Sequence, residues 1–163
     1  MKSLQSLAMW FAGFIAVLAT PVFGVTCSVS TIGVSLGTYI PNQTAATDSA
    51  GMVIIDCAKG ALDALPTTVN YSVDISRGAS LNYAPREMIS GVNTLRYNLY
   101  RDASRISVWG DTTGGTSNVT AALQLQAPLG TVSGSHSVYG RIFAAQNAVP
   151  GAYSDVIIVT VNY

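Results

Sequence analysis

The chain has 163 residues, a formal net charge of zero and only 10% charged residues, while 49% of its residues are hydrophobic. Nucleic-acid binding depends on clustered Lys and Arg, so the six dispersed arginines exclude that function. The scarcity of Lys and Glu disfavours long solvated helices, and the abundance of Gly, Ser, Thr, Val and Tyr is typical of strands joined by turns.

The N-terminal segment has the organisation of a secretory signal peptide. Lys2 supplies a positive charge, residues 7–18 form an uncharged apolar run, and small residues follow at Ala19, Thr20 and Gly24. The run is shorter than the roughly 20 residues that a membrane span needs, which favours a cleaved signal over a retained anchor. We expect residues 1–24 to be a signal peptide, with cleavage after Ala19 as the alternative. Residues 25–163 should then form one domain without a membrane span.

The next feature is a pair of cysteines, Cys27 and Cys57. In an exported chain an even pair is most simply one disulfide, and closing this loop stabilises a fold by roughly 3 to 4 kcal/mol. The single histidine, His136, lies in a Gly-Ser-rich run that predicts an exposed loop. That run lacks the strand-to-helix elbow of a serine nucleophile, and no Cys-His cluster is present. We therefore expect no catalytic residue, no metal and no cofactor.

Apolar segments of strand length recur between turn residues. In chain order, the expected strands are Val25–Ile32, Val34–Tyr39, Met52–Cys57, Thr67–Ser76, Leu95–Arg101, Val119–Ala127, Ser137–Ala144 and Ala152–Tyr163. Alternation is clearest in the fourth, where Val69, Tyr71, Val73 and Ile75 share one face and polar residues share the other. Short strands at this spacing, with little helical periodicity, predict an all-β, antiparallel β-sandwich with Greek-key connections.

The last twelve residues predict a strand that continues to the end of the chain. Counting in twos places one set of mostly apolar residues on a single face: Tyr153, Ile157, Val159, Val161 and Tyr163. The segment contains no Lys, Pro or bulge signal that would protect an edge strand from pairing with another chain. We therefore expect this strand to need a partner.

Several short motifs, taken together in their order, resemble those of a known family. They are Cys27–Val29, Gly37–Tyr39, Asp56–Cys57, Tyr71–Gly78, Arg86–Met88, Leu95–Asp102, Trp109–Asp111, Val138–Ile142 and Gly151–Asp155. Their combination spans essentially the whole chain after the signal segment. It resembles the spore coat protein U domain family, which includes the pilins of archaic, Csu-type, chaperone-usher pili.

The resemblance implies an immunoglobulin-like sandwich that is incomplete, because it lacks its final strand. In such pilins a periplasmic pilus chaperone fills the resulting groove, and a strand from a neighbouring pilus subunit later takes its place. The terminal strand from Tyr153 to Tyr163 is then the strand with which the chaperone pairs. The resemblance also implies an outer-membrane usher as a partner, export through the periplasm to the surface of a Gram-negative bacterium, and a role in surface attachment and biofilm formation.

The chain departs from the family pattern ahead of its first cysteine. Polymerising pilins carry a donor segment there, whereas cleavage after Gly24 would leave only Val25 and Thr26 before Cys27. Cleavage after Ala19 would leave a segment of seven residues that Pro21 interrupts. The expectation is a subunit that accepts a strand but does not donate one, most naturally at the fibre tip.

The alternative is a self-contained secreted coat protein or carbohydrate-binding module. Trp109 and the tyrosines could line a sugar-binding surface, although their positions beside Leu, Val and Ile favour core packing. The two hypotheses differ in whether the sandwich closes with its own strands. A complete sandwich should fold alone, whereas an incomplete one should aggregate or be degraded without a chaperone.

Overall fold

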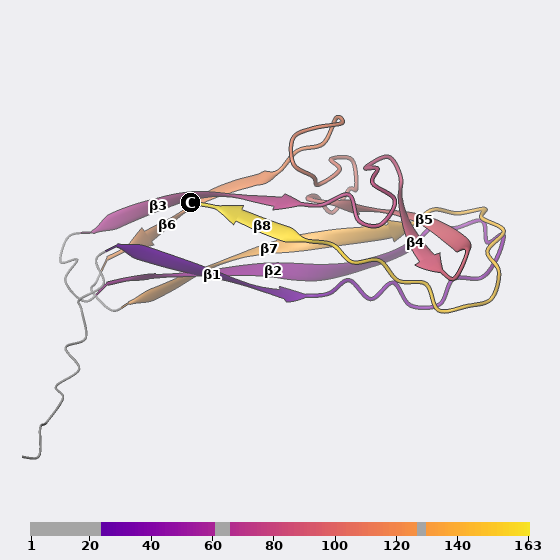
Figure 1. Ribbon diagram of the computed structural model, residues 1–163, viewed down its shortest axis with the longest axis horizontal. Coiled ribbons are helices and arrows are strands. Elements are labelled where there is room, and N and C mark those ends of the chain that lie inside the picture. Colours follow the sequence, from indigo (N-terminus) through magenta and orange to yellow (C-terminus); the bar gives the residue numbers. More distant parts are fainter. Residues whose placement is uncertain (1–23, 61–65, 127–129) are drawn as a thin grey trace, which may run out of the picture.

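The computed structural model describes residues 24–60, 66–126 and 130–163. Within these residues, eight strands form two antiparallel sheets that pack face to face (Figure 1). The strands are β1 (Val25–Ile32), β2 (Thr47–Lys59), β3 (Thr67–Ile75), β4 (Arg86–Ser90), β5 (Asn93–Tyr100), β6 (Val119–Leu125), β7 (Thr131–Ile142) and β8 (Val159–Asn162). The all-β fold predicted from the alternating pattern is confirmed.

The two sheets differ in size and in which strands form their edges. The larger sheet has the order β1-β2-β7-β5-β4, and the smaller sheet has the order β6-β3-β8. Every paired strand runs antiparallel to its neighbour. Strands β1 and β8, from opposite ends of the described chain, therefore each have one edge without a partner strand in the part of the chain that the structure describes.

The core lies between the two sheets and is built from alternate positions of their strands. On β3, the predicted inward set of Val69, Tyr71, Val73 and Ile75 is buried, each residue with an exposed fraction of 7% or less. Trp109 comes from the connection between β5 and β6, is fully buried, and donates its indole N–H to the Val73 carbonyl at 2.9 Å. This one hydrogen bond anchors a long connection to the core.

Arg86, at the start of β4, is a fully buried charge. Its Nε and Nη2 donate to the Ser76 carbonyl at 3.0 and 2.9 Å, and Nη1 donates to Asn98 Oδ1 at 2.7 Å. Nη2 also donates to the Trp109 carbonyl at 2.7 Å, and the guanidinium lies 4.8 Å from the ring centroid of Tyr83. Burial lowers the pKa of Arg86. A buried guanidinium is tolerated only when its N–H groups are satisfied in this way.

The observed strands differ from the predicted ones mainly in their lengths. Strands β2 and β7 are longer than expected, because they pair with each other along nearly their whole lengths, and β1 and β5 extend the sheet on either side. Strand β4, which pairs with β5, was not predicted, because it is short and rich in polar residues and lacks a clear apolar alternation. The expected signal peptide lies outside the described residues except for Gly24 and stays a prediction.

Two expected strands lack a continuous ladder. Residues 34–39 are not a strand, and the terminal strand pairs with β3 only from Val159 to Asn162, with one isolated bridge between Ser154 and Ile89. The prediction of a strand over residues 152–163 was therefore too long. Both segments have the alternation of strands, but β-structure also requires a hydrogen-bonding neighbour.

Candidate functional site

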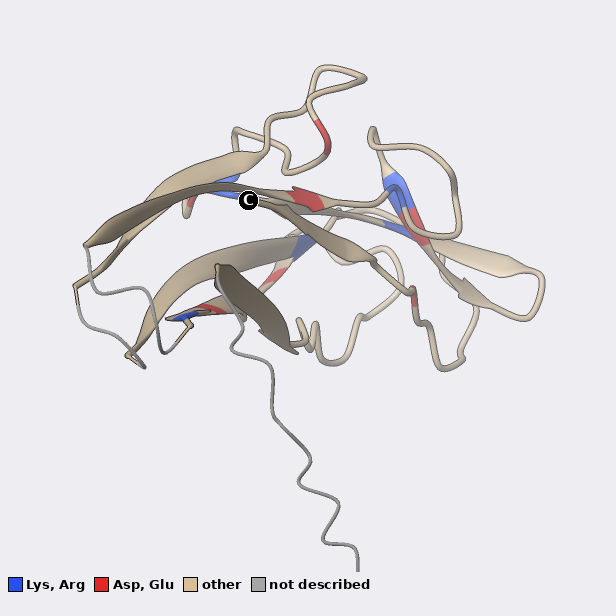
Figure 2. Cartoon of the chain, turned by 60° about the vertical axis from the view of Figure 1, so that its left-hand side comes forward, with Lys and Arg blue, Asp and Glu red and all other residues tan. Residues whose placement is uncertain are grey.

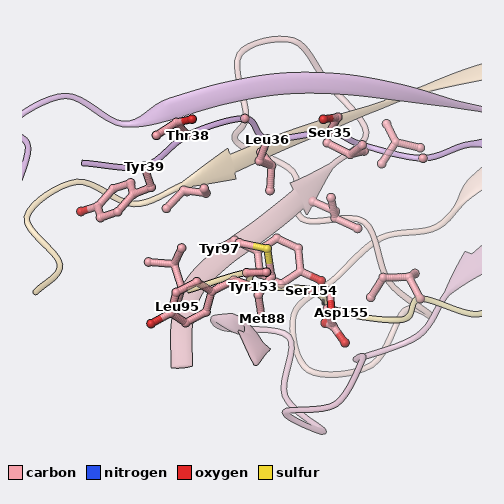
Figure 3. Close-up of a pocket in the computed structure, with 18 of the residues that line it drawn as sticks. Ser35, Leu36, Thr38, Tyr39, Met88, Leu95, Tyr97, Tyr153, Ser154 and Asp155 are labelled. Atoms are coloured by element: carbon pink, nitrogen blue, oxygen red, sulfur yellow. Dashed lines mark hydrogen bonds between the residues drawn. The ribbon is translucent and has the colours of Figure 1, made fainter. Parts of the chain in front are cut away.

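An apolar groove of about 840 Å³ separates these two segments. One wall is formed by residues 31–39, at the end of β1 and beyond it, and the other by residues 148–159, before β8 and at its start. Core side chains of the larger sheet form part of its lining, among them Met88, Leu95 and Tyr97 (Figure 3). Asp155 is the one charged residue among the described residues that line the groove.

The first wall crosses the inner face of the larger sheet over two glycines. Gly51 on β2 pairs with Val138, so Gly51 and Gly140 share the core-facing side of neighbouring strands. A Cβ at Gly140 would lie 2.6 Å from Val34 Cγ1 and 3.1 Å from Leu36 Cδ2. A Cβ at Gly51 would clash with the Ile32 carbonyl. The bare backbone at both positions lets Val34 and Leu36 settle close to the sheet.

The backbone of the first wall is unpaired. Among the described residues, 34–38 form no backbone hydrogen bond with another part of the chain. The wall is held by the packing of Val34 and Leu36 against the core and, at its end, by Tyr39, whose hydroxyl accepts from the Gln146 N–H at 2.8 Å. Its amide and carbonyl groups are therefore free to pair with an added strand.

The second wall passes from the larger sheet to the smaller one. Ser154 exchanges two backbone hydrogen bonds with Ile89 of β4, at 2.9 and 3.2 Å. Ile158 accepts from the Ser76 N–H at 2.9 Å and donates to the Ser76 hydroxyl at 2.9 Å. The chain then enters β8, which pairs with β3 on one side only. The groove therefore lies between two free backbone edges.

The structure brings together most of the terminal residues singled out from the sequence. Tyr153, Ile157 and Val159 line the groove, and Val161 packs against the core beyond it. Tyr163 does not join them, because its side chain is 59% exposed and borders a separate shallow hollow with Asn70 and Ser72. Pairing of these residues with a chaperone stays a prediction.

The predicted disulfide between Cys27 and Cys57 is confirmed. The two residues lie directly opposite each other in the β1–β2 register, and Cys57 is fully buried. The bond therefore ties the start of β1 to β2 within the larger sheet.

The prediction that His136 lies in an exposed loop was wrong. His136 is in β7, opposite Val53 of β2, and its Nε2 lies 2.8 Å from the Tyr71 hydroxyl on the other sheet. Burial lowers its pKa. The Gly and Ser residues around it are strand residues, because a half-buried antiparallel strand accepts small residues where a facing side chain approaches closely. His136 is not among the residues that line the groove.

The charged residues are scattered over both sheets and their connections, with the two signs interspersed (Figure 2). The described residues contain no group of three or more His, Cys, Asp or Glu side chains that could hold a metal ion. Across ranges 24–60, 66–126 and 130–163, no helix is long and apolar enough to cross a membrane. The groove is thus the site with the most distinctive chemistry in the described chain.

Sequence reasoning missed two parts of this site. It treated residues 34–39 as a strand leading into a turn, whereas they form an unpaired wall. It also did not place Asp155 in a binding site, although its carboxylate accepts a hydrogen bond from Tyr97 at 2.6 Å inside the groove region. The available signals were the alternation of Val34 and Leu36 and the single charge in an otherwise apolar terminal segment.

Comparison with known proteins assigns this fold to a family. The Spore Coat Protein U domain matches residues 14–160, so the chain belongs to that family. It is 27% identical over 134 residues to Protein U of Myxococcus xanthus, and the aligned region covers 79% of this chain and 70% of that protein. The family expected from the sequence motifs is confirmed.

A solved structure shares the fold. A chain of the CsuC–CsuE chaperone–tip adhesion subunit pre-assembly complex, from the archaic chaperone-usher Csu pili of Acinetobacter baumannii, matches with a TM-score of 0.54 and 19% identity. The match covers 85% of this chain and 40% of that chain, so this protein spans less than half the length of that structural relative. The likeness supports the immunoglobulin-like, antiparallel sandwich predicted from the sequence.

Proposed function

We propose that this protein is an exported subunit of an archaic chaperone-usher pilus and that its groove accepts a β-strand from another polypeptide. A periplasmic chaperone supplies the strand first, and a neighbouring subunit replaces it during assembly at the outer-membrane usher. The role is structural, so no residue is assigned a catalytic function and no cofactor is required. Family membership and the shared fold support this proposal.

The main observation behind the proposal is that two free backbone edges border one apolar groove. An extended strand placed there could pair with the unbonded residues 34–38 on one side and with β8 on the other. Its alternate side chains would enter the groove, as in other cases of β-strand addition. Without such a strand, unpaired edges and an apolar hollow both remain exposed to solvent, a combination that promotes aggregation.

The terminal strand is the proposed pairing edge for the chaperone. Ile157 and Val159 would contact the groove-facing side chains of the incoming strand, and Tyr153 would close one end. Val161 would extend the contact along β8, whereas the exposed Tyr163 would contribute through its backbone.

The proposed place in the fibre is the tip, with a role in surface attachment and biofilm formation. Strand β1 pairs with β2 from Val25 onward and is cross-linked at Cys27, so these residues cannot serve as a donor strand for another subunit. Any donor would have to precede Val25. Purified protein should therefore form homopolymers only when an alternating apolar segment is added ahead of Cys27, and homopolymers of residues 25–163 alone would contradict the tip position.

Strand acceptance can be tested by supplying the strand in the same chain. A turn and an alternating apolar strand, fused after Tyr163, could run antiparallel to β8 along the groove. We expect a higher yield of soluble monomer and a higher melting temperature than for the unmodified chain. A matched fusion with Asp at each groove-facing position should give neither gain. Co-expression with a cognate chaperone should raise the yield of the unmodified chain and not that of the apolar fusion.

A chain that is stable without a donor strand or a chaperone would contradict the proposal. If the unmodified chain is a stable monomer and neither the fused strand nor a chaperone changes its yield or melting temperature, the sandwich closes by itself. The self-contained coat protein or carbohydrate-binding module would then be the better description.

A further inference from the structure

The carboxylate of Asp155 joins three separate parts of the fold at the second wall of the groove. Its Oδ2 accepts a hydrogen bond from the Tyr97 hydroxyl of β5 at 2.6 Å (Figure 3). Its Oδ1 accepts from the backbone N–H of Ala79, in the connection between β3 and β4, at 2.9 Å. The N–H of the next residue, Val156, also donates to Oδ1 at 2.8 Å.

The space for this carboxylate is provided by Gly78, which has no side chain. Gly78 has a φ of +70°, which other residues rarely adopt, and a Cβ there would clash with the Asp155 carboxylate. Gly78 therefore serves both the turn after β3 and the close approach of the carboxylate.

The electrostatics of the site favour a permanent hydrogen bond. Tyr97 is 3% exposed, and burial, followed by its hydrogen bond to Asp155, raises its pKa far above the ordinary value. The phenol therefore stays protonated and acts as the donor. The buried guanidinium of Arg86 also interacts favourably with the negative charge of Asp155.

We propose that Asp155 and Tyr97 form a latch that holds residues 153–158 in the geometry of a strand before the donor strand arrives. This inference rests on the proposed function and makes both residues positioning residues for strand acceptance. Apart from the latch, backbone contacts at Ser154 and Ile158 fix this wall to the sheets before β8 begins. The first wall has no comparable fixation, since residues 34–38 make no backbone hydrogen bond.

The physical role of the latch is pre-organisation. An edge that is already ordered loses little conformational entropy when a strand pairs with it. When the edge is ordered only part of the time, its apparent affinity for the strand is reduced to the intrinsic affinity multiplied by the ordered fraction. Loss of the latch should therefore slow the capture of a strand. It should leave the dissociation of a captured strand nearly unchanged, because the added strand itself then holds the edge in place.

The test uses Tyr97→Phe, which keeps the ring in the groove floor and removes only the hydroxyl, together with Asp155→Asn. Tyr139→Phe is the matched control, because this β7 tyrosine faces Arg105 and does not line the groove. The probe is a labelled synthetic peptide of alternating apolar and polar residues, added to residues 25–163 at low concentration. We expect each latch variant to lower the association rate about tenfold and to change the dissociation rate less than about twofold.

Hydrogen exchange supplies a second measurement that does not depend on peptide binding. In the free protein, the amides of Ser154 and Ile158 should exchange faster in Tyr97→Phe than in the wild type or in Tyr139→Phe. In the strand-fused protein described above, this difference should disappear. Should Asp155→Asn fail to fold, Tyr97→Phe alone decides the outcome.

Three results would overturn the latch. Association rates equal to that of the wild type would show that the wall needs no latch, and so would unchanged hydrogen exchange. A faster dissociation rate in Asp155→Asn would show that the carboxylate contacts the bound strand directly. If the wild-type protein captured no peptide, strand acceptance itself would be contradicted, and the exchange measurement would still decide whether the latch orders the wall.

Discussion

The hydroxyl of Tyr71 on β3 lies 2.8 Å from Nε2 of His136 on β7, so a hydrogen bond between side chains joins the two sheets across the core. The ring centroids are 5.7 Å apart. Gly134 makes room for this contact, because a Cβ there would clash with the Tyr71 hydroxyl. A neutral imidazole with its proton on Nδ1 can accept the phenolic proton at Nε2, whereas an imidazolium cannot.

The stability of the fold should therefore depend on pH through His136. Burial lowers its pKa below the ordinary value of 6.5, so at a pH between the two values the unfolded chain binds more protons than the folded chain. The free energy of unfolding should be flat between roughly pH 7.5 and 9, below the range in which tyrosines titrate, and should fall as the pH drops through 6.5 towards the folded pKa of His136. Urea unfolding over this range measures it. His136 is the single histidine in the chain, so His136→Gln should remove the slope, and an unchanged slope would refute its origin in His136.

Removing the disulfide should destabilise the protein by about 2 to 4 kcal/mol. The appropriate variant replaces both Cys27 and Cys57 by Ala, because Cys57 is fully buried and a serine hydroxyl there would lack a partner. Urea unfolding of this variant, compared with the oxidised and the reduced wild type, separates the effect of the cross-link from that of packing. A loss below about 1 kcal/mol would show that β1 stays on the sheet without its covalent tie.

Arg86→Lys should cost about 3 kcal/mol, although the charge is kept. The guanidinium satisfies the Ser76 and Trp109 carbonyls and the Asn98 side chain at once, and a single ammonium cannot match that planar arrangement. Arg77→Lys is the control, because Arg77 is exposed and lies 5.2 Å from the centroid of the same Tyr83 ring. Equal losses of stability in the two variants, measured by urea unfolding, would argue against a special role for the buried arginine.

Gly140→Ala should narrow the groove. The added methyl group would press on Val34 and Leu36 and lift the first wall from the larger sheet. We expect capture of the synthetic strand peptide to weaken about tenfold, with a loss of stability of about 1 to 3 kcal/mol from overpacking. Gly33→Ala adds the same group where nothing lies within 4 Å, so its effect should be smaller. If both variants captured the peptide equally well, the close fit at Gly140 would not set the width of the groove.

The residues of β3 show how much of the fold the pattern of the chain predicts. The alternation of Val69, Tyr71, Val73 and Ile75 correctly identified the strand and its buried face, and the even cysteine count predicted the disulfide. Arg86 shows the limit, because an arginine is ordinarily assigned to the surface and its burial depends on acceptors from three distant parts of the chain. His136 was misplaced for the same reason, since its partner on β3 lies 65 positions away in the sequence.

The sequence by itself determined the all-β character, the single disulfide and the alternation of apolar residues in the terminal segment, because alternation and composition act between near neighbours in the chain. Only the tertiary structure decided that β1 and β8 lie in different sheets and that residues 34–38 and 153–158 face each other across one groove. Strand order and register depend on hydrogen bonds and packing between residues far apart in the chain, and local periodicity does not specify them. The same holds for Asp155, whose neighbours Tyr97 and Ala79 meet it only after both sheets have formed.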